Sequence, residues 1–159
     1  MSIASTILRA VTGAFILNSG WNKKDLPAEA AGGLQEMAAT GIPQLKDMDA
    51  DTFGKFISYS EMGVGAALLA PFVSTRLAGA ALTTFGSGLL TMYFGNDDMT
   101  ESDGIRPSQE GTALAKDSWL VAIGAALLLW PNDKARAKKA EKRAKKAEKK
   151  ADKAVKAAK

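Results

Sequence analysis

Long uncharged segments constrain this chain more than any other feature. Residues 64–75 and 77–96 contain no charged side chain. A helix that crosses a bilayer needs ~17–25 mostly apolar residues. Four stretches approach or reach that length, at residues 3–20, 57–73, 77–95 and 113–130. The fourth does so only when Lys116 and Asp117 lie at the membrane interface. We therefore predict four transmembrane helices.

A soluble four-helix bundle is the alternative for a chain of 159 residues. Each of its helices would carry one apolar stripe and one charged face. The uncharged segments have no charged face, and a chain this small cannot bury four helices that are apolar on every side. The favoured fold class is therefore all-α, a transmembrane four-helix bundle over residues 1–131 followed by an Ala/Lys-rich tail over residues 132–159.

The connections between the apolar stretches differ in kind. Residues 34–42 of the long first loop read LQEMAATGI, and their apolar positions share one helical face, which predicts a short interfacial helix. The second connection is only residues 74–76, so the second and third stretches should form a tight antiparallel hairpin. Pro71, near the end of the second stretch, predicts a kink in that helix.

The distribution of basic residues predicts the topology, because cytoplasmic flanks are enriched in Lys and Arg. Residues 132–159 hold 13 of the 21 Lys and Arg residues, and the short second loop carries Arg76 without an acidic residue. The first and third loops have more acidic than basic side chains. These counts predict a multi-pass membrane protein with both termini in the cytoplasm.

Arg9 and Glu61 lie inside the predicted spans, where ionisable side chains are costly and suggest function. They are expected at different depths, because Arg9 is near the cytoplasmic side and Glu61 near the outer side. We expect Thr83 and Thr84 beside Arg9. The neighbours expected for Glu61 are Asn18, Tyr93, and Lys116 or Ser118. The alternative is that both side chains snorkel to the nearest headgroups.

Small residues recur at the four-residue spacing that lets transmembrane helices approach closely. The positions expected to serve helix packing are Gly63, Ala67, Gly79, Thr83 and Ser87. Packing within the bundle is the first interpretation of these faces. A ligand pocket or a docking face for a partner helix is the alternative.

The tail after residue 131 repeats Ala at alternating spacings of three and four residues, which predicts a basic cytoplasmic helix. Its function is open between a solvated helix, adhesion to anionic inner-leaflet lipid and docking on an acidic partner. Nucleic-acid binding is not expected, because no aromatic residue accompanies the charge. The residues expected to contact lipid or a partner are Lys138, Lys139, Lys142, Arg143, Lys145, Lys146, Lys149 and Lys150.

The chain contains no Cys and no His, which excludes disulfides, thiolate or imidazole metal ligands, and nucleophiles activated by His. The acidic third loop, with Asp97, Asp98, Glu101 and Asp103, lacks the spacing of a calcium-binding loop. We expect no metal site, no catalytic residue and no cofactor held by this chain itself.

The chain resembles the DoxX family of small bacterial membrane proteins over about residues 1–131. The likeness consists of LRAVTGAFILNSGWNKK at the first stretch, ATGIP in the first loop, SEMGVGAALL, RLAGAAL and KDSWLVAIGAALLL. The resemblance implies a four-helix membrane bundle, with Arg9 and Glu61 at the positions of recurring charged residues. Some members are linked to quinone-reducing oxidoreductases, and others are thought to scaffold redox-stress proteins at the membrane.

Three functions are compatible with these features. The first is a non-catalytic accessory subunit associated with other integral membrane proteins of a larger complex, most plausibly a respiratory or oxidoreductase complex. The second is a quinone- or lipid-handling subunit with a pocket near Arg9 or Glu61. The third is a small proton-coupled transporter that uses Glu61, which is disfavoured because no pair of interrupted helices is evident.

Overall fold

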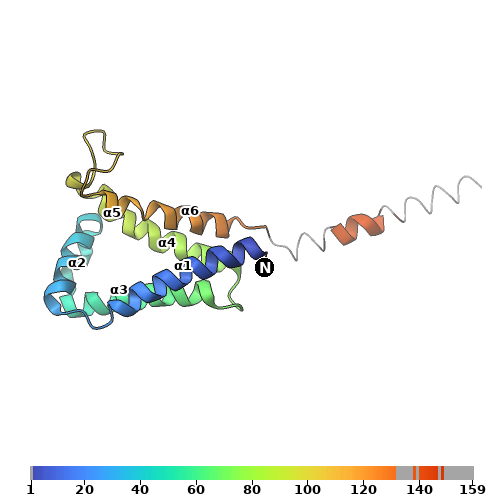
Figure 1. Ribbon diagram of the computed structural model, residues 1–159, viewed down its shortest axis with the longest axis horizontal. Helices are drawn as coiled ribbons and strands as arrows, with labels where there is room; N and C mark the ends of the chain where they lie inside the picture. The colour runs from blue at the N-terminus through green and yellow to red at the C-terminus, as the bar shows by residue number, and fades with distance from the viewer. Residues whose placement is uncertain (1, 132–137, 139, 147, 149–159) are drawn as a thin grey trace, which may run out of the picture.

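The computed structural model describes residues 2–131, 138, 140–146 and 148, and every named element of this part is helical (Figure 1). The prediction of an all-α fold is therefore confirmed. The elements are α1 (Ile3–Asn22), α2 (Ala28–Gly41), η1 (Pro43–Asp47), α3 (Ala50–Leu69), α4 (Thr75–Phe94), η2 (Asp97–Met99), α5 (Thr112–Ala115) and α6 (Ser118–Leu128).

The four long helices form two closely packed pairs, α1 with α3 and α4 with α6 (Figure 1). The pairs are joined by the short α3–α4 turn and by a common core. All four helices contribute to that core, whose buried members are Ile16, Leu68, Ala78, Leu82 and Leu127. The start of α1, the α3–α4 turn and the end of α6 lie at one end of the molecule, which we call the turn end (Figure 1).

Helix α2 closes the opposite end, where it runs between the first half of α3 and the last half of α4 (Figure 1). A Cβ atom added to Gly54 of α3 would lie 3.1 Å from Ala31 Cβ. The buried amide of Gln35 donates to the carbonyl oxygens of Leu45 and Met48, both at 2.6 Å, and so fastens η1 beneath α2. The short helix expected in the first loop is therefore present, and it begins six residues earlier than residue 34.

Two of the predicted spans differ from the observed helices, and the connection between α3 and α4 is residues 70–74 rather than 74–76. Helix α3 spans residues 50–69 rather than 57–73, because Asp49 accepts a hydrogen bond from the Thr52 N–H and caps it earlier. It ends before Pro71, since the residue that precedes a proline is disfavoured in a helix, so the expected kink is not formed. The fourth stretch is divided into α5 and α6 at Lys116 and Asp117.

Helices α1 and α4 are the two of the described part that are long and apolar enough to cross a membrane. Helix α6 has only 11 residues, and α3 carries charged side chains in its first half. Large apolar side chains are nevertheless exposed along the bundle, among them Ile3, Val11, Phe15, Leu77, Phe94, Trp119 and Leu129. Exposed apolar side chains, where they form a continuous patch, mark contact with a membrane or a partner.

Candidate functional site

The Arg9 side chain is 2% exposed and is surrounded by backbone carbonyl groups at the turn end. Its acceptors lie in the last turn of α3 and in the turn that follows. Nε donates to Leu68 O at 2.8 Å, Nη1 to Val73 O at 2.9 Å, and Nη2 to Ala67 O at 3.2 Å and Ala70 O at 2.7 Å. Carbonyls of a last helical turn have no partner within the helix. Arg9 therefore caps α3 and fixes the α3–α4 turn.

Thr83 and Thr84, which we expected beside Arg9, are not among the groups that bind it. The Thr83 hydroxyl donates to Gly79 O within α4, and Thr84 is exposed. The sequence could not show the carbonyl acceptors, because every residue supplies a carbonyl group and only the folded turn converges four of them. Snorkelling to headgroups is also not what the structure shows, since the guanidinium is enclosed by the fold.

The buried Glu61 forms an ion pair with the partly exposed Lys23, which follows directly after α1. Lys23 Nζ lies 3.0 Å from Glu61 Oε2, and the two side chains are 25% and 8% exposed. The same ammonium group donates to the Ser19 hydroxyl at 2.6 Å and to Ser19 O at 3.5 Å. Asp117, between α5 and α6, lies within electrostatic range of both Glu61 and Lys23. The cluster thus joins the α1–α3 pair to the start of α6.

Two of the neighbours expected for Glu61, Asn18 and Tyr93, have other surroundings, whereas the expected Lys116 and Ser118 flank Asp117, which interacts electrostatically with Glu61. Asn18 is on the exposed face of α1, and the Tyr93 hydroxyl donates to Ile105 O at 2.8 Å. In that same loop the Arg106 guanidinium and two backbone N–H groups hold the pKa of Asp103 below its ordinary value. Sequence reasoning missed Lys23, because it stands just outside the predicted span. The sequence did hold one signal: Lys23 follows Ser19 by four residues, a spacing that puts both side chains on the same face of α1.

Removal of the Lys23 ammonium group should destabilise the fold, because it leaves the Glu61 carboxylate buried and close to Asp117. We expect Lys23→Met to lower the free energy of unfolding by about 1–3 kcal/mol. The double variant Lys23→Met/Glu61→Leu should recover part of this loss, since no buried charge then lacks a partner. Thermal unfolding followed by intrinsic Trp fluorescence measures both. Additive losses in the double variant would contradict the coupling.

Small residues set the spacing between the helices of each pair. A Cβ atom on Gly79 would collide with the backbone of α6 at Leu128, so Gly79 lies at the closest approach of α4 and α6. Thr83 faces Gly124 across the same contact. Gly63, by contrast, has open space around it, and the close approach on α3 is made by Gly65. The expected face through Gly63 is therefore displaced by two residues.

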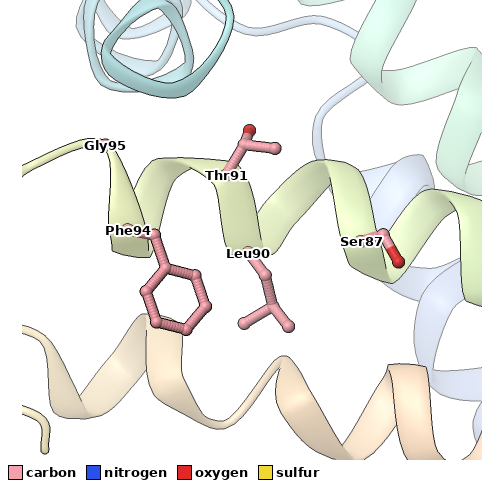
Figure 2. Close-up of a pocket in the computed structure, with 5 residues that line it drawn as sticks. All are labelled: Ser87, Leu90, Thr91, Phe94 and Gly95. Carbon is pink, nitrogen blue, oxygen red and sulfur yellow. The ribbon is translucent and has the colours of Figure 1, made fainter. Parts of the chain in front are cut away.

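The remaining packing positions have different surroundings. Ala67 lies partly buried and supplies a carbonyl group to Arg9, whereas Ser87 is exposed and lines a groove on α4. The groove has a volume of about 480 Å³ and runs along α4 beside the α5–α6 segment (Figure 2). Its lining residues are Ser87, Leu90, Thr91, Phe94 and Gly95. The Thr91 hydroxyl donates to Gly88 O at 2.6 Å, so the groove offers mainly apolar surface.

The described residues of the basic tail are exposed and partly helical. Lys145 pairs with Glu141 at 2.7 Å, one helical turn away. Lys138, Lys142, Arg143 and Lys146 share this exposed state. The other tail residues expected to contact lipid or a partner, Lys139, Lys149 and Lys150, lie outside the described residues.

Comparison with protein-family models, with curated proteins and with solved structures finds no match for this chain. The protein is therefore classified here by its own fold and site. Within its described residues the protein consists of two helix pairs with exposed apolar side chains, a buried arginine near the α3–α4 turn and a partly buried ion pair between Lys23 and Glu61.

Proposed function

We propose that this chain is an integral protein of the bacterial plasma membrane that serves as a non-catalytic accessory subunit of a larger membrane complex. Helices α1 and α4 are each long and apolar enough to span the bilayer. Helix α3, and α6 together with its flanking residues, would supply the other two spans of a four-span bundle. The turn end, with the basic tail beside it, would face the cytoplasm, which agrees with the enrichment of Lys and Arg on that side.

The exposed face of α1 carries the proposal. Val11, Ala14, Phe15 and Asn18 lie at helical spacing on this face, and Val11 and Phe15 are 67% and 70% exposed. Asn18 is exposed and makes no hydrogen bond with any of the described residues. A side-chain amide on a lipid-facing surface favours association with another helix that can bond to it. This face therefore suits a transmembrane helix of a partner subunit.

The interactions of Arg9 and Glu61 favour an accessory role over a role in transport. Arg9 serves the α3–α4 turn, and Glu61 is held by Lys23. A transporter would need Glu61 to release its partner during each cycle. Both groups are instead used to join helices.

A respiratory or oxidoreductase complex is proposed as the partner because of the resemblance to the DoxX family, some of whose members are linked to such enzymes. The second candidate, a quinone- or lipid-handling subunit, is favoured by the groove on α4 (Figure 2). Its mainly apolar lining suits a hydrocarbon tail. Titration of the purified protein with a quinone tests this candidate, with Leu90→Ala in the groove lining and Glu61→Gln outside it for comparison, and absence of binding removes it.

Affinity purification from native membranes in mild detergent, read by mass spectrometry, tests the accessory role. We expect redox-enzyme subunits to co-purify with the full chain. Asn18→Leu should reduce their yield about fivefold, the effect of losing one interhelical hydrogen bond of about 1 kcal/mol. Ala122→Leu, on the exposed face of α6, is the matched control and should leave the yield unchanged.

The same experiment with residues 132–159 deleted asks whether the tail takes part in docking. Retained partners would assign docking to the bundle, and lost partners would assign it to the tail. A wild-type chain that purifies alone, as a monomer, would overturn the accessory role.

A further inference from the structure

The guanidinium group of Arg76, at the turn end, has hydrogen-bond donors that the rest of the described chain does not satisfy. Arg76, the second residue of α4, is exposed, and its Nε donates to Trp130 O at 3.2 Å. This bond holds the side chain against the end of α6. Its two terminal nitrogens have no acceptor among the described residues. Arg9, at the same end, is by contrast enclosed by carbonyl groups.

Exposed apolar side chains accompany Arg76 in the chain. Phe72, four residues before it in the short turn, is 89% exposed, and the adjoining Leu77 is 63% exposed. Leu129, next to the residue that accepts the Arg76 hydrogen bond, is 79% exposed. An exposed guanidinium group at the same end of the molecule as these exposed apolar residues matches the chemistry of a bilayer interface, where acyl chains end and phosphates begin.

The local charge favours an anion. No acidic residue occurs in the sequence between Glu61 and Asp97, so α4 brings no carboxylate to compete for Arg76. In the sequence, the residues that follow α6 and Trp130 hold 13 of the 21 Lys and Arg residues. Arginine binds phosphate oxygens through two parallel N–H groups, which the ammonium group of lysine cannot reproduce.

We propose that Arg76, with Phe72 and Leu129, forms a headgroup site for an anionic phospholipid of the inner leaflet. The guanidinium group binds the phosphodiester through its terminal nitrogens, and the apolar side chains lie against the acyl chains. The proposal rests on the membrane topology given above, and it names the lipid class and the residues that hold it. Lipid bound here would brace the α3–α4 turn against the end of α6.

Native mass spectrometry of the full chain tests this site. The detergent-purified protein is mixed with phosphatidylglycerol and phosphatidylcholine of identical acyl chains, and the retained adducts are compared. We expect a preference for phosphatidylglycerol that falls about fivefold in Arg76→Gln. Arg106→Gln, which removes an exposed arginine from the α4–α5 loop, is the matched control and should keep the preference.

Three further results decide the proposal. Arg76→Lys, which keeps the charge, should give an intermediate preference and guards against misfolding of Arg76→Gln. Inorganic phosphate should not raise Tm, whereas phosphatidylglycerol should. Equal losses in Arg76→Gln and Arg106→Gln, or stabilisation by phosphate alone, would overturn the lipid site. If the wild-type chain keeps its preference for phosphatidylglycerol but purifies without partner proteins, only the accessory role is overturned.

Discussion

Replacement of Arg9 by alanine is expected to lower the thermal unfolding midpoint by roughly 5–10 °C, the largest effect of any single side chain in this protein. The guanidinium group donates to the backbone carbonyl oxygens of Ala67, Leu68, Ala70 and Val73, of which Ala70 O also accepts from Val73 N. A buried acceptor left without a donor costs about 1–3 kcal/mol. We therefore expect a loss of at least about 3 kcal/mol in the free energy of unfolding.

Arg9→Lys separates the charge from the geometry of this interaction. Lysine has a single nitrogen and cannot reach acceptors on both sides of the turn, so most of the loss should remain. Intrinsic Trp fluorescence during heating measures both variants, and Arg106→Gln in the exposed loop is the control for loss of a positive charge. A midpoint for Arg9→Ala within 1–2 °C of wild type, about the effect of a typical surface substitution, would contradict the capping role.

Substitution of Gly65 by alanine should separate α1 from α3, whereas the same substitution at Gly63 should not. A Cβ atom at Gly65 would lie 2.6 Å from Leu17 N and 2.8 Å from Leu17 Cα. These are backbone atoms, so the helices must move apart, at a cost of about 1–3 kcal/mol. At Gly63 no atom of another helix lies within 4 Å of the added Cβ, and alanine favours the helix by about 1 kcal/mol.

The two variants are matched, since they lie on one helix and add the same methyl group. We expect Gly65→Ala to lower Tm by several degrees and Gly63→Ala to leave it unchanged or slightly higher. Thermal unfolding of both proteins in one detergent provides the comparison. Equal changes at the two positions would show that α1 does not approach α3 at Gly65.

Much of the helix content follows from local sequence. The uncharged run over residues 77–96 predicted α4 almost residue for residue, because an apolar segment of this length without proline has few alternatives to a helix. The boundaries of α3 were less accessible. They depend on the Asp49 cap and on Pro71, and hydropathy records neither of these local signals.

At the candidate site, the sequence identified the charged residues but not their partners. Arg9 and Glu61 stand out in the sequence because ionisable residues within apolar stretches are rare. Their partners did not follow from the pattern. Carbonyl groups occur at every residue, and Lys23 is separated from Glu61 by 38 positions in the chain. Only the packing of α1 along α3 brings these groups together.

The sequence by itself thus determined the all-helical class, a short connection between α3 and α4 although not its bounds, and the two charges that must find partners, because hydropathy and charge act over short segments. The tertiary structure alone decided which carbonyls enclose Arg9, which cation holds Glu61, and that Gly65 rather than Gly63 sets the α1–α3 distance. Those outcomes depend on the rotation of each helix about its own axis. That rotation is fixed by contacts between segments far apart in the chain.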